Sequence, residues 1–86
     1  MRKYRFITDP GHGWLEVPTA ELRELGIAEQ ISTYSYVSVD GLRAYLEEDC
    51  DAPRFNNARG DSWEIEEVYQ ENTFVRLLRH YSKEDK

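Results

Sequence analysis

The residues best suited to chemistry are two histidines, one cysteine and the glycine-rich segment Asp9-Pro10-Gly11-His12-Gly13-Trp14. Such a loop can present backbone N–H groups to an anion, and the imidazole of His12 can act as an acid or a base. The spacing matches neither the dinucleotide-binding fingerprint nor the P-loop, and Asp9 would repel a phosphate. We therefore interpret the segment as a turn between two strands, shaped by its proline and two glycines. We expect Trp14, the first large residue after the turn, to be mostly buried.

The spacing of possible ligands does not predict a metal site. His12 and His80, the only histidines, lie 68 positions apart, and neither HxH nor HxxxH spacing occurs. The four carboxylates that flank Cys50 should raise the pKa of its thiol, which disfavours a nucleophilic role. The same acidic run lacks the spacing of a calcium loop, although it could attract divalent ions weakly. We expect no metal, no cofactor and no catalytic residue.

The negative charge of the chain is concentrated in one segment. The net charge is −6, which argues against direct nucleic-acid binding. Residues 47–71 contain nine acidic and two basic residues, a net charge of −7, so the rest of the chain is about neutral. Glu64 and Glu66 have the spacing that places two carboxylates on one face of a strand. Acid–base catalysis would need one of them in a dry pocket, so we interpret them as an exposed acidic row.

A tyrosine-rich hairpin is the best candidate for a binding surface. Asp40-Gly41 separates two β-like runs and predicts a two-residue type I′ turn, in a register that pairs Tyr36 with Tyr45. The expected core face comprises Ser35, Val37, Val39, Leu42, Ala44 and Leu46, and the outer face comprises Tyr34, Tyr36, Ser38, Arg43, Tyr45 and Glu47. Tyr and Arg are enriched at binding hot spots. A stabilising cross-strand ladder is the alternative interpretation.

The hydrophobic pattern predicts six short strands and two helices. The strands are expected at 3–8, 14–17, 32–39, 42–47, 62–70 and 74–81, with helices at 18–25 and 52–59 that end at glycines. Residues 74–81 also fit a helix, but the short turn before them favours a closing strand. We expect Asp51 to cap the second helix, Phe55 and Ala58 to face inward, and a bulge at Glu66-Glu67.

Length and composition limit the class of protein. The 86 residues fit one domain, and 40% hydrophobic with 13% aromatic residues indicate a globular chain. No apolar run approaches the roughly 20 residues of a membrane span, and the first residues lack the pattern of a signal peptide. The single cysteine excludes an internal disulfide. We expect a cytoplasmic protein with no membrane association.

Several short motifs carry a resemblance to a known family. They are Asp9-Pro10-Gly11-His12-Gly13-Trp14 with Val17-Pro18, Tyr34-Ser35-Tyr36 and Tyr45-Leu46-Glu47-Glu48-Asp49. On these residues the chain resembles a family of small acidic proteins that phages, plasmids and integrated elements carry. The resemblance implies a mobile-element setting and supplies no catalytic residue. Accessory proteins of such elements often bind and block host machinery.

These features predict an α+β domain spanning 1–86, with a frayed tail at 82–86. It has a mainly antiparallel sheet of five or six strands and two short helices on one face. We expect a non-enzymatic accessory protein that binds a protein partner. The more specific hypothesis is an inhibitor of a host defence enzyme or nucleic-acid enzyme. The alternatives are a small enzyme that uses His12 and a structural or regulatory protein with no inhibitory role. The candidate partner-binding residues are Tyr34, Tyr36, Arg43, Tyr45, Glu47, Glu48, Asp49, Glu64 and Glu66.

Overall fold

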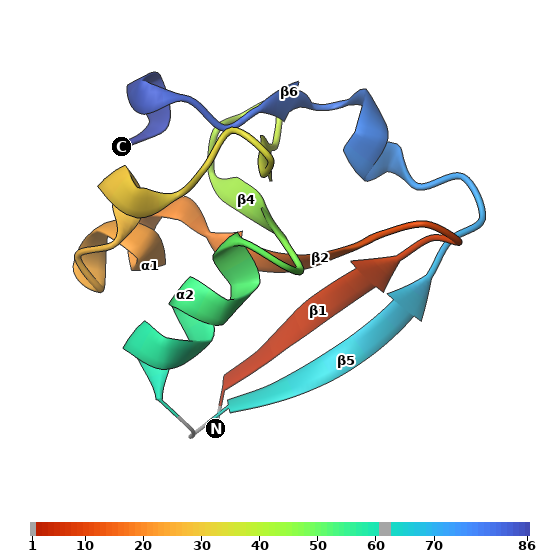
Figure 1. Cartoon of the computed structure of the whole chain (residues 1–86), viewed down its shortest axis with the longest axis horizontal. Coiled ribbons are helices and arrows are strands. Elements are labelled where there is room, and N and C mark those ends of the chain that lie inside the picture. Colours follow the sequence, from red (N-terminus) through yellow and green to blue (C-terminus); the bar gives the residue numbers. More distant parts are fainter. Residues whose placement is uncertain (1, 61–62) are drawn as a thin grey trace.

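The chain folds around one mixed six-stranded sheet in the order β5-β1-β2-β4-β3-β6 (Figure 1). The computed structural model describes residues 2–60 and 63–86. The strands are β1 (Arg2–Thr8), β2 (Gly13–Pro18), β3 (Tyr36–Val37), β4 (Arg43–Glu47), β5 (Trp63–Tyr69) and β6 (Arg79–His80). The α-helices are α1 (Thr19–Glu24) and α2 (Asp51–Arg59), and three short 3-10 helices are η1 (Ala28–Gln30), η2 (Phe74–Leu77) and η3 (Lys83–Asp85). The α+β class and the order of strands and helices along the chain are confirmed.

The sheet differs from the prediction at its β5 edge, where β5 runs parallel to β1. All other paired strands are antiparallel. The reason is the position of α2 between β4 and β5. This helix carries the chain from the end of β4 back to the end of the sheet where β1 begins, so β5 runs in the same direction as β1, as after a crossover helix. The register from Arg2↔Trp63 to Thr8↔Tyr69 is continuous, so the predicted bulge at Glu66-Glu67 does not form. The expected first residue of this strand, Ser62, lies outside the described residues.

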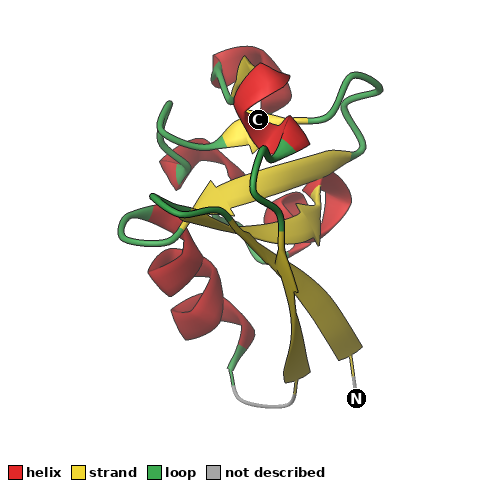
Figure 2. Ribbon diagram, turned by 90° about the vertical axis from the view of Figure 1, so that its right-hand side faces the viewer, coloured by secondary structure: helices red, strands yellow, loops and turns green. Residues whose placement is uncertain are grey.

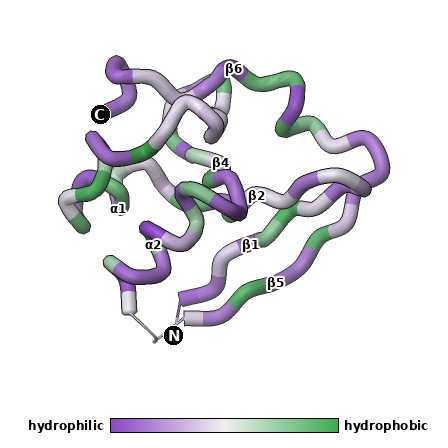
Figure 3. The backbone as a smooth tube through the Cα atoms, in the orientation of Figure 1, coloured by the Kyte–Doolittle hydropathy of each residue, from purple (hydrophilic) through white to green (hydrophobic). Residues whose placement is uncertain are grey.

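Each face of the sheet has its own core because strand residues alternate between the two faces. On one face, Leu15 and Phe55 belong to a cluster that both α-helices complete. On the other face, Trp14 packs with a smaller group that includes Val75 of η2. Figure 2 shows β1 and β5 extending away from the rest of the sheet, and in Figure 3 hydrophobic and hydrophilic stretches follow one another along β5. The η2 segment therefore covers the face opposite the α-helices.

The β3–β4 hairpin confirms the predicted register but not the predicted turn. Tyr36 pairs with Tyr45, and Val37 with Ala44. The turn is longer, since Gly41 N donates to Ser38 O at 2.9 Å and Gly41 alone of the central pair has a positive φ, of 75°. The Asp40 carboxylate stabilises this turn by accepting from Leu42 N and Ser38 Oγ.

Lengthening of the turn removes two residues from the expected core face. Val39 is 95% exposed and Leu42 is 65% exposed, because both lie in the loop rather than on a strand. Ser35, Val37, Ala44 and Leu46 are fully buried, as expected. The predicted core face is therefore wrong only for Val39 and Leu42, which lie beyond the last strand pair, Val37 with Ala44.

Both α-helices differ from the prediction at their N-terminal ends. Pro18 takes the N-cap position of α1 rather than its first turn. Asp51 does not cap α2; it is the first residue of the helix, and its fully buried carboxylate accepts from Ser32 N and the hydroxyls of Ser32 and Ser35. Phe55 is buried as predicted, whereas Ala58 is exposed because the inner face of α2 follows Asp51, Phe55 and Arg59 at four-residue spacing.

The C-terminal segment closes the sheet at the edge opposite β5. Residues 74–81 form η2 followed by β6, which pairs with β3, so the predicted hairpin with β5 does not form. Residues 82–86 are not frayed in the structure: Asp85 of η3 forms an ion pair with Arg79 at 2.7 Å, and Tyr81 is fully buried. Within 2–60 and 63–86, no helix is long and apolar enough to cross a membrane.

Candidate functional site

The loop that carries His12 is shaped by the Asp9 side chain. Its carboxylate accepts hydrogen bonds from Gly11 N at 2.9 Å and His12 N at 2.8 Å, and it forms an ion pair with Arg76. The Arg76 guanidinium, helped by these two backbone N–H groups, holds the pKa of Asp9 well below its usual range. Gly11 and Gly13 do not have positive φ angles, so the prediction that glycine conformation shapes this loop is wrong.

Gly13 is required for a different reason, which is close packing. A Cβ atom at this position would lie 2.7 Å from the Phe6 ring and 3.1 Å from Glu48 Oε2. The absence of a side chain therefore gives the Glu48 carboxylate its place beside the loop. Gly13 also fixes the start of β2, where its carbonyl accepts from Glu48 N at 3.1 Å.

A row of aromatic rings extends from the loop to the far edge of the sheet. The ring centroids of His12 and Trp14 are 5.9 Å apart, and those of Trp14 and Tyr36 are 6.1 Å apart. Tyr36 stacks on His80 at 4.5 Å. The Arg76 guanidinium lies 5.3 Å from the centre of the Trp14 ring, in the range of a cation–π contact. Trp14 is 2% exposed, which confirms its predicted burial.

A pocket of about 400 Å³ opens along this row. Its lining residues are His12, Trp14, Tyr34, Tyr36, Glu47, Asp49, Cys50, Arg76 and His80. The fold thus gathers both histidines, two tyrosines of the expected outer face and two carboxylates of the acidic segment around one cavity. The sequence did not predict this convergence because it depends on β6 pairing with β3.

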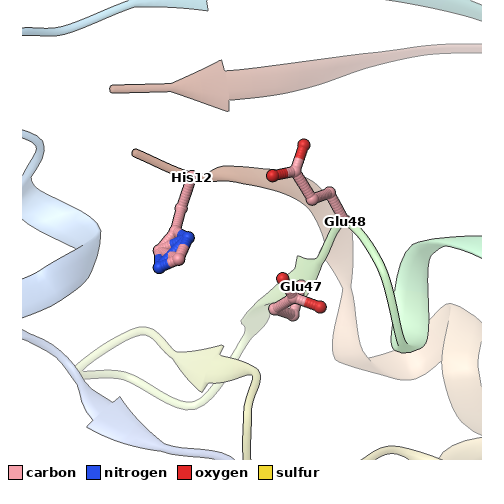
Figure 4. A group of neighbouring side chains, drawn as sticks. All are labelled: His12, Glu47 and Glu48. Carbon is pink, nitrogen blue, oxygen red and sulfur yellow. The ribbon is translucent and has the colours of Figure 1, made fainter. Parts of the chain in front are cut away.

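Three possible metal ligands lie close together beside this pocket (Figure 4): His12 and Glu47 line it, whereas Glu48 lines another cavity. One nitrogen of His12 and one carboxylate oxygen from each of Glu47 and Glu48 lie within 4.8 Å of one another. Glu47 is oriented by its Oε1 atom, which accepts from Asp49 N at 2.8 Å and Cys50 N at 2.9 Å. Sequence spacing missed this cluster because His12 comes from the β1–β2 loop and the glutamates from the end of β4.

The predicted binding residue Tyr45 is not available at the surface. It is 4% exposed, packs edge-on against Phe74 at 5.4 Å and donates a hydrogen bond to Glu16 at 2.9 Å. Burial, reinforced by the hydrogen bond to Glu16, raises the pKa of Tyr45 to about 12. The prediction that Tyr45 binds a partner is therefore corrected: η2 covers this tyrosine, whereas Tyr34 is 66% exposed.

The remaining predicted binding residues lie elsewhere on the sheet. Glu64 and Glu66 on β5 lie in register with Lys3 and Arg5 of β1, but Arg5 forms its ion pair with Glu16, and neither carboxylate forms an ion pair within the described residues. Arg43 lines a different cavity, away from the aromatic row. Another acidic residue of the 47–71 segment, Asp61, lies outside the described residues. The predicted set is thus divided among the pocket beside His12, the cavity at Arg43, strand β5 and, for Tyr45, the core.

Cys50 retains the protonated thiol that the sequence predicts. Burial raises the pKa of the Cys50 thiol, and the carboxylates of Glu47, Asp51 and Asp49 raise it further. A raised thiol pKa reduces the thiolate fraction at neutral pH and argues against a nucleophilic role.

Comparisons with known proteins give no relative from which a function could be transferred. No family model, no curated protein and no solved structure matches the chain. The resemblance to small mobile-element proteins stays a prediction, and the pocket beside His12 is the basis for inferring function.

Proposed function

We propose that this protein is a non-enzymatic binding protein that holds a basic segment of a protein partner in the pocket beside His12. The observation that carries the proposal is the convergence of Tyr34, Tyr36, Glu47 and Asp49 on that one cavity. All four were candidate binding residues on sequence grounds, and they come from two separate segments of the chain.

The chemistry of the pocket suits an arginine or lysine side chain. Aromatic rings attract a cation over their faces, and Tyr34 presents a largely exposed ring. Among residues 2–60 and 63–86, Glu47 and Asp49 form no ion pair with a lysine or arginine of this chain. Their charge is therefore left for a partner. Arg76 does not cancel it, because its guanidinium is paired with Asp9.

The narrower form of the proposal is an inhibitor that a mobile element supplies in the cytoplasm. Its target would be a basic nucleic-acid-binding protein of the host, whose phosphate-binding arginines meet the carboxylates instead. Glu64 and Glu66 lie on β5 and do not line the pocket, so the carboxylates that would act in such mimicry are those at the end of the acidic segment near Glu47. A regulatory partner that is not inhibited would use the same pocket.

The test begins with affinity capture from the natural host and mass spectrometry, followed by kinetic measurements on the purified pair. The double substitution Glu47→Gln with Asp49→Asn removes charge at constant size. We expect it to lower the association rate and to flatten its dependence on salt, because charge steering is lost. The matched control is Glu64→Gln with Glu66→Gln, which should leave the affinity unchanged. Equal effects of the two double variants would contradict the assignment of the pocket.

An enzyme that uses His12 is the second candidate, and one observation favours it. Glu47 and Glu48 are titratable groups that converge on His12 within 4.8 Å. The surroundings nevertheless do not favour proton transfer. His12 is exposed, and neither glutamate is buried in the dry pocket that shifts the pKa of a catalytic carboxylate. Loss of a measured turnover in His12→Ala, with the fold and partner binding intact, would establish this candidate over the first.

A further inference from the structure

We propose that His12, Glu47 and Glu48 form a binding site for one divalent transition-metal ion, with zinc as the favoured ion. This site goes beyond the proposed function, because it is defined by these three side chains and requires no protein partner. It is the one group of three such ligands found among residues 2–60 and 63–86.

The donor atoms already lie close to the geometry of a metal site. Their separations of up to 4.8 Å compare with about 3.3 Å between neighbouring ligands of a tetrahedral ion bound at about 2.0–2.1 Å. Small rotations of the exposed His12 ring and of the Glu48 side chain would close this difference. Figure 4 shows the His12 imidazole and the Glu47 and Glu48 carboxylates gathered where the β1–β2 loop lies beside the end of β4.

Two of the ligands are held in position by groups outside the cluster. Glu47 Oε1 accepts from two backbone N–H groups, so that carboxylate has a fixed orientation and its second oxygen is left to bind an ion. The backbone of His12 is fixed by its N–H donation to Asp9, whose carboxylate is in turn paired with Arg76. The fold therefore already restricts the Glu47 side chain and the His12 backbone, which a metal ion would otherwise have to order on binding.

The charge and the atom types select the class of ion. Within the described chain, neither Glu47 nor Glu48 pairs with a lysine or arginine, so the cluster offers an ion two carboxylates whose charge no cationic side chain of this chain offsets. Magnesium and calcium prefer oxygen ligands alone, whereas an imidazole nitrogen favours zinc and its neighbours in the first transition row. Three protein ligands leave at least one coordination position for water or for a donor from another molecule.

An ion bound by His12, Glu47 and Glu48 would connect two segments that lie far apart in the sequence. His12 belongs to the loop between β1 and β2, and the glutamates belong to the junction between β4 and α2. An ion held by both segments binds only the folded chain, so it should raise the melting temperature as its concentration rises. The same ion would also lie beside the pocket, next to Glu47.

The test uses the untagged full chain and Zn²⁺ alone, measured by calorimetric titration and by thermal melting. We expect saturable binding at one ion per chain and a melting temperature that rises with Zn²⁺. His12→Ala and Glu48→Gln should each weaken binding by more than about 10-fold, since even loss of an outer partner of a ligand costs 10–100-fold. Circular dichroism establishes that each variant is folded.

Two matched variants make the assignment specific. His80→Ala removes the other histidine of the same pocket, and Cys50→Ser removes the neighbouring thiol; both should retain Zn²⁺ affinity. Ring-nitrogen NMR signals of His12, and not those of His80, should shift with Zn²⁺. Absence of saturable binding, retention of affinity in His12→Ala, or an equal loss in His80→Ala would overturn the proposal. Because no partner is present, these outcomes are independent of the proposed binding function.

Discussion

The Asp9 carboxylate and the Arg76 guanidinium, 67 positions apart in the sequence, form an ion pair that joins the His12 loop to η2. The carboxylate is nearly inaccessible to solvent, with 4% of its side chain exposed. The same pair places Arg76 over Trp14 and fixes the backbone of His12. One contact thus supports both the core under η2 and the position of the candidate site.

The Asp9–Arg76 pair should make stability depend on pH in acid. The pKa of Asp9 in the folded protein lies below its ordinary value of 3.8. Its contribution is therefore present above pH 3.8 and is lost as the pH falls through the folded value. We expect Asp9→Asn to melt at a lower temperature than the wild type at neutral pH, and the difference to narrow below about pH 4.

Melting curves followed by circular dichroism from neutral to acidic pH measure this difference. Asp49→Asn is the matched control because Asp49 is an exposed carboxylate, and its melting temperature should follow that of the wild type throughout. A difference between Asp9→Asn and the wild type that stays constant with pH would argue against the ion pair as its cause.

The two glycines of the His12 loop should respond differently to a methyl group. Gly13→Ala places its Cβ 2.7 Å from the Phe6 ring, so it should destabilise the protein by about 1–3 kcal/mol through overpacking. At Gly11 the closest atom is the flexible end of Arg76 at 3.3 Å, and Gly11→Ala should change stability little. Urea unfolding compares the pair. Equal stabilities of the two variants would contradict the close approach to Phe6.

Local patterns in the sequence predicted those features that neighbouring residues determine. The Asp40-Gly41 turn signal predicted the pairing of Tyr36 with Tyr45, and the position of the large Trp14 ring after a turn predicted its burial. Gly26 follows α1 with a positive φ of 74°, as a helix end requires. Each of these features depends on contacts within a few residues or across one hairpin.

Features that depend on distant contacts could not be predicted in this way. No local signal indicates that Arg76 pairs with Asp9, that β5 joins β1 in parallel, or that η2 covers Tyr45. The metal-ligand cluster was missed for the same reason, since His12 and Glu48 meet only after β2 and β4 pair. Sequence spacing along one element detects ligand sets on that element and not sets assembled between elements.

Gly41 should be the position in the β3–β4 turn that resists substitution. Its φ is 75° and no atom would contact an added Cβ, so backbone strain is the sole cost. We expect Gly41→Val to destabilise the protein by about 1–2 kcal/mol. Val39→Thr, in the same turn but 95% exposed, is the control and should be neutral. An unchanged melting temperature for Gly41→Val would refute this backbone geometry.

Two tyrosines predicted for one surface should have separate roles. Tyr45→Ala removes a buried ring packed on Phe74 and should destabilise the protein by about 3–5 kcal/mol. Tyr34→Ala removes an exposed ring, so stability should stay within about 0.5 kcal/mol while the partner dissociates faster. Chemical denaturation and dissociation kinetics measure the two effects. A destabilised Tyr34→Ala would place this ring in the core instead.

The raised pKa of Tyr45 should appear as a late step in an alkaline titration. Folding raises this pKa from the ordinary value of 10.0 to about 12, because burial and the hydrogen bond to Glu16 oppose formation of the tyrosinate. The stability that Tyr45 contributes is therefore fully present below pH 10 and is lost as the pH rises towards 12. Tyrosinate absorbance measured against pH should show one fewer late-titrating group in Tyr45→Phe than in the wild type. If Tyr45→Phe instead removed a group that titrates near the ordinary value of 10.0, Tyr45 would be solvent-accessible and η2 would not cover this face of the sheet.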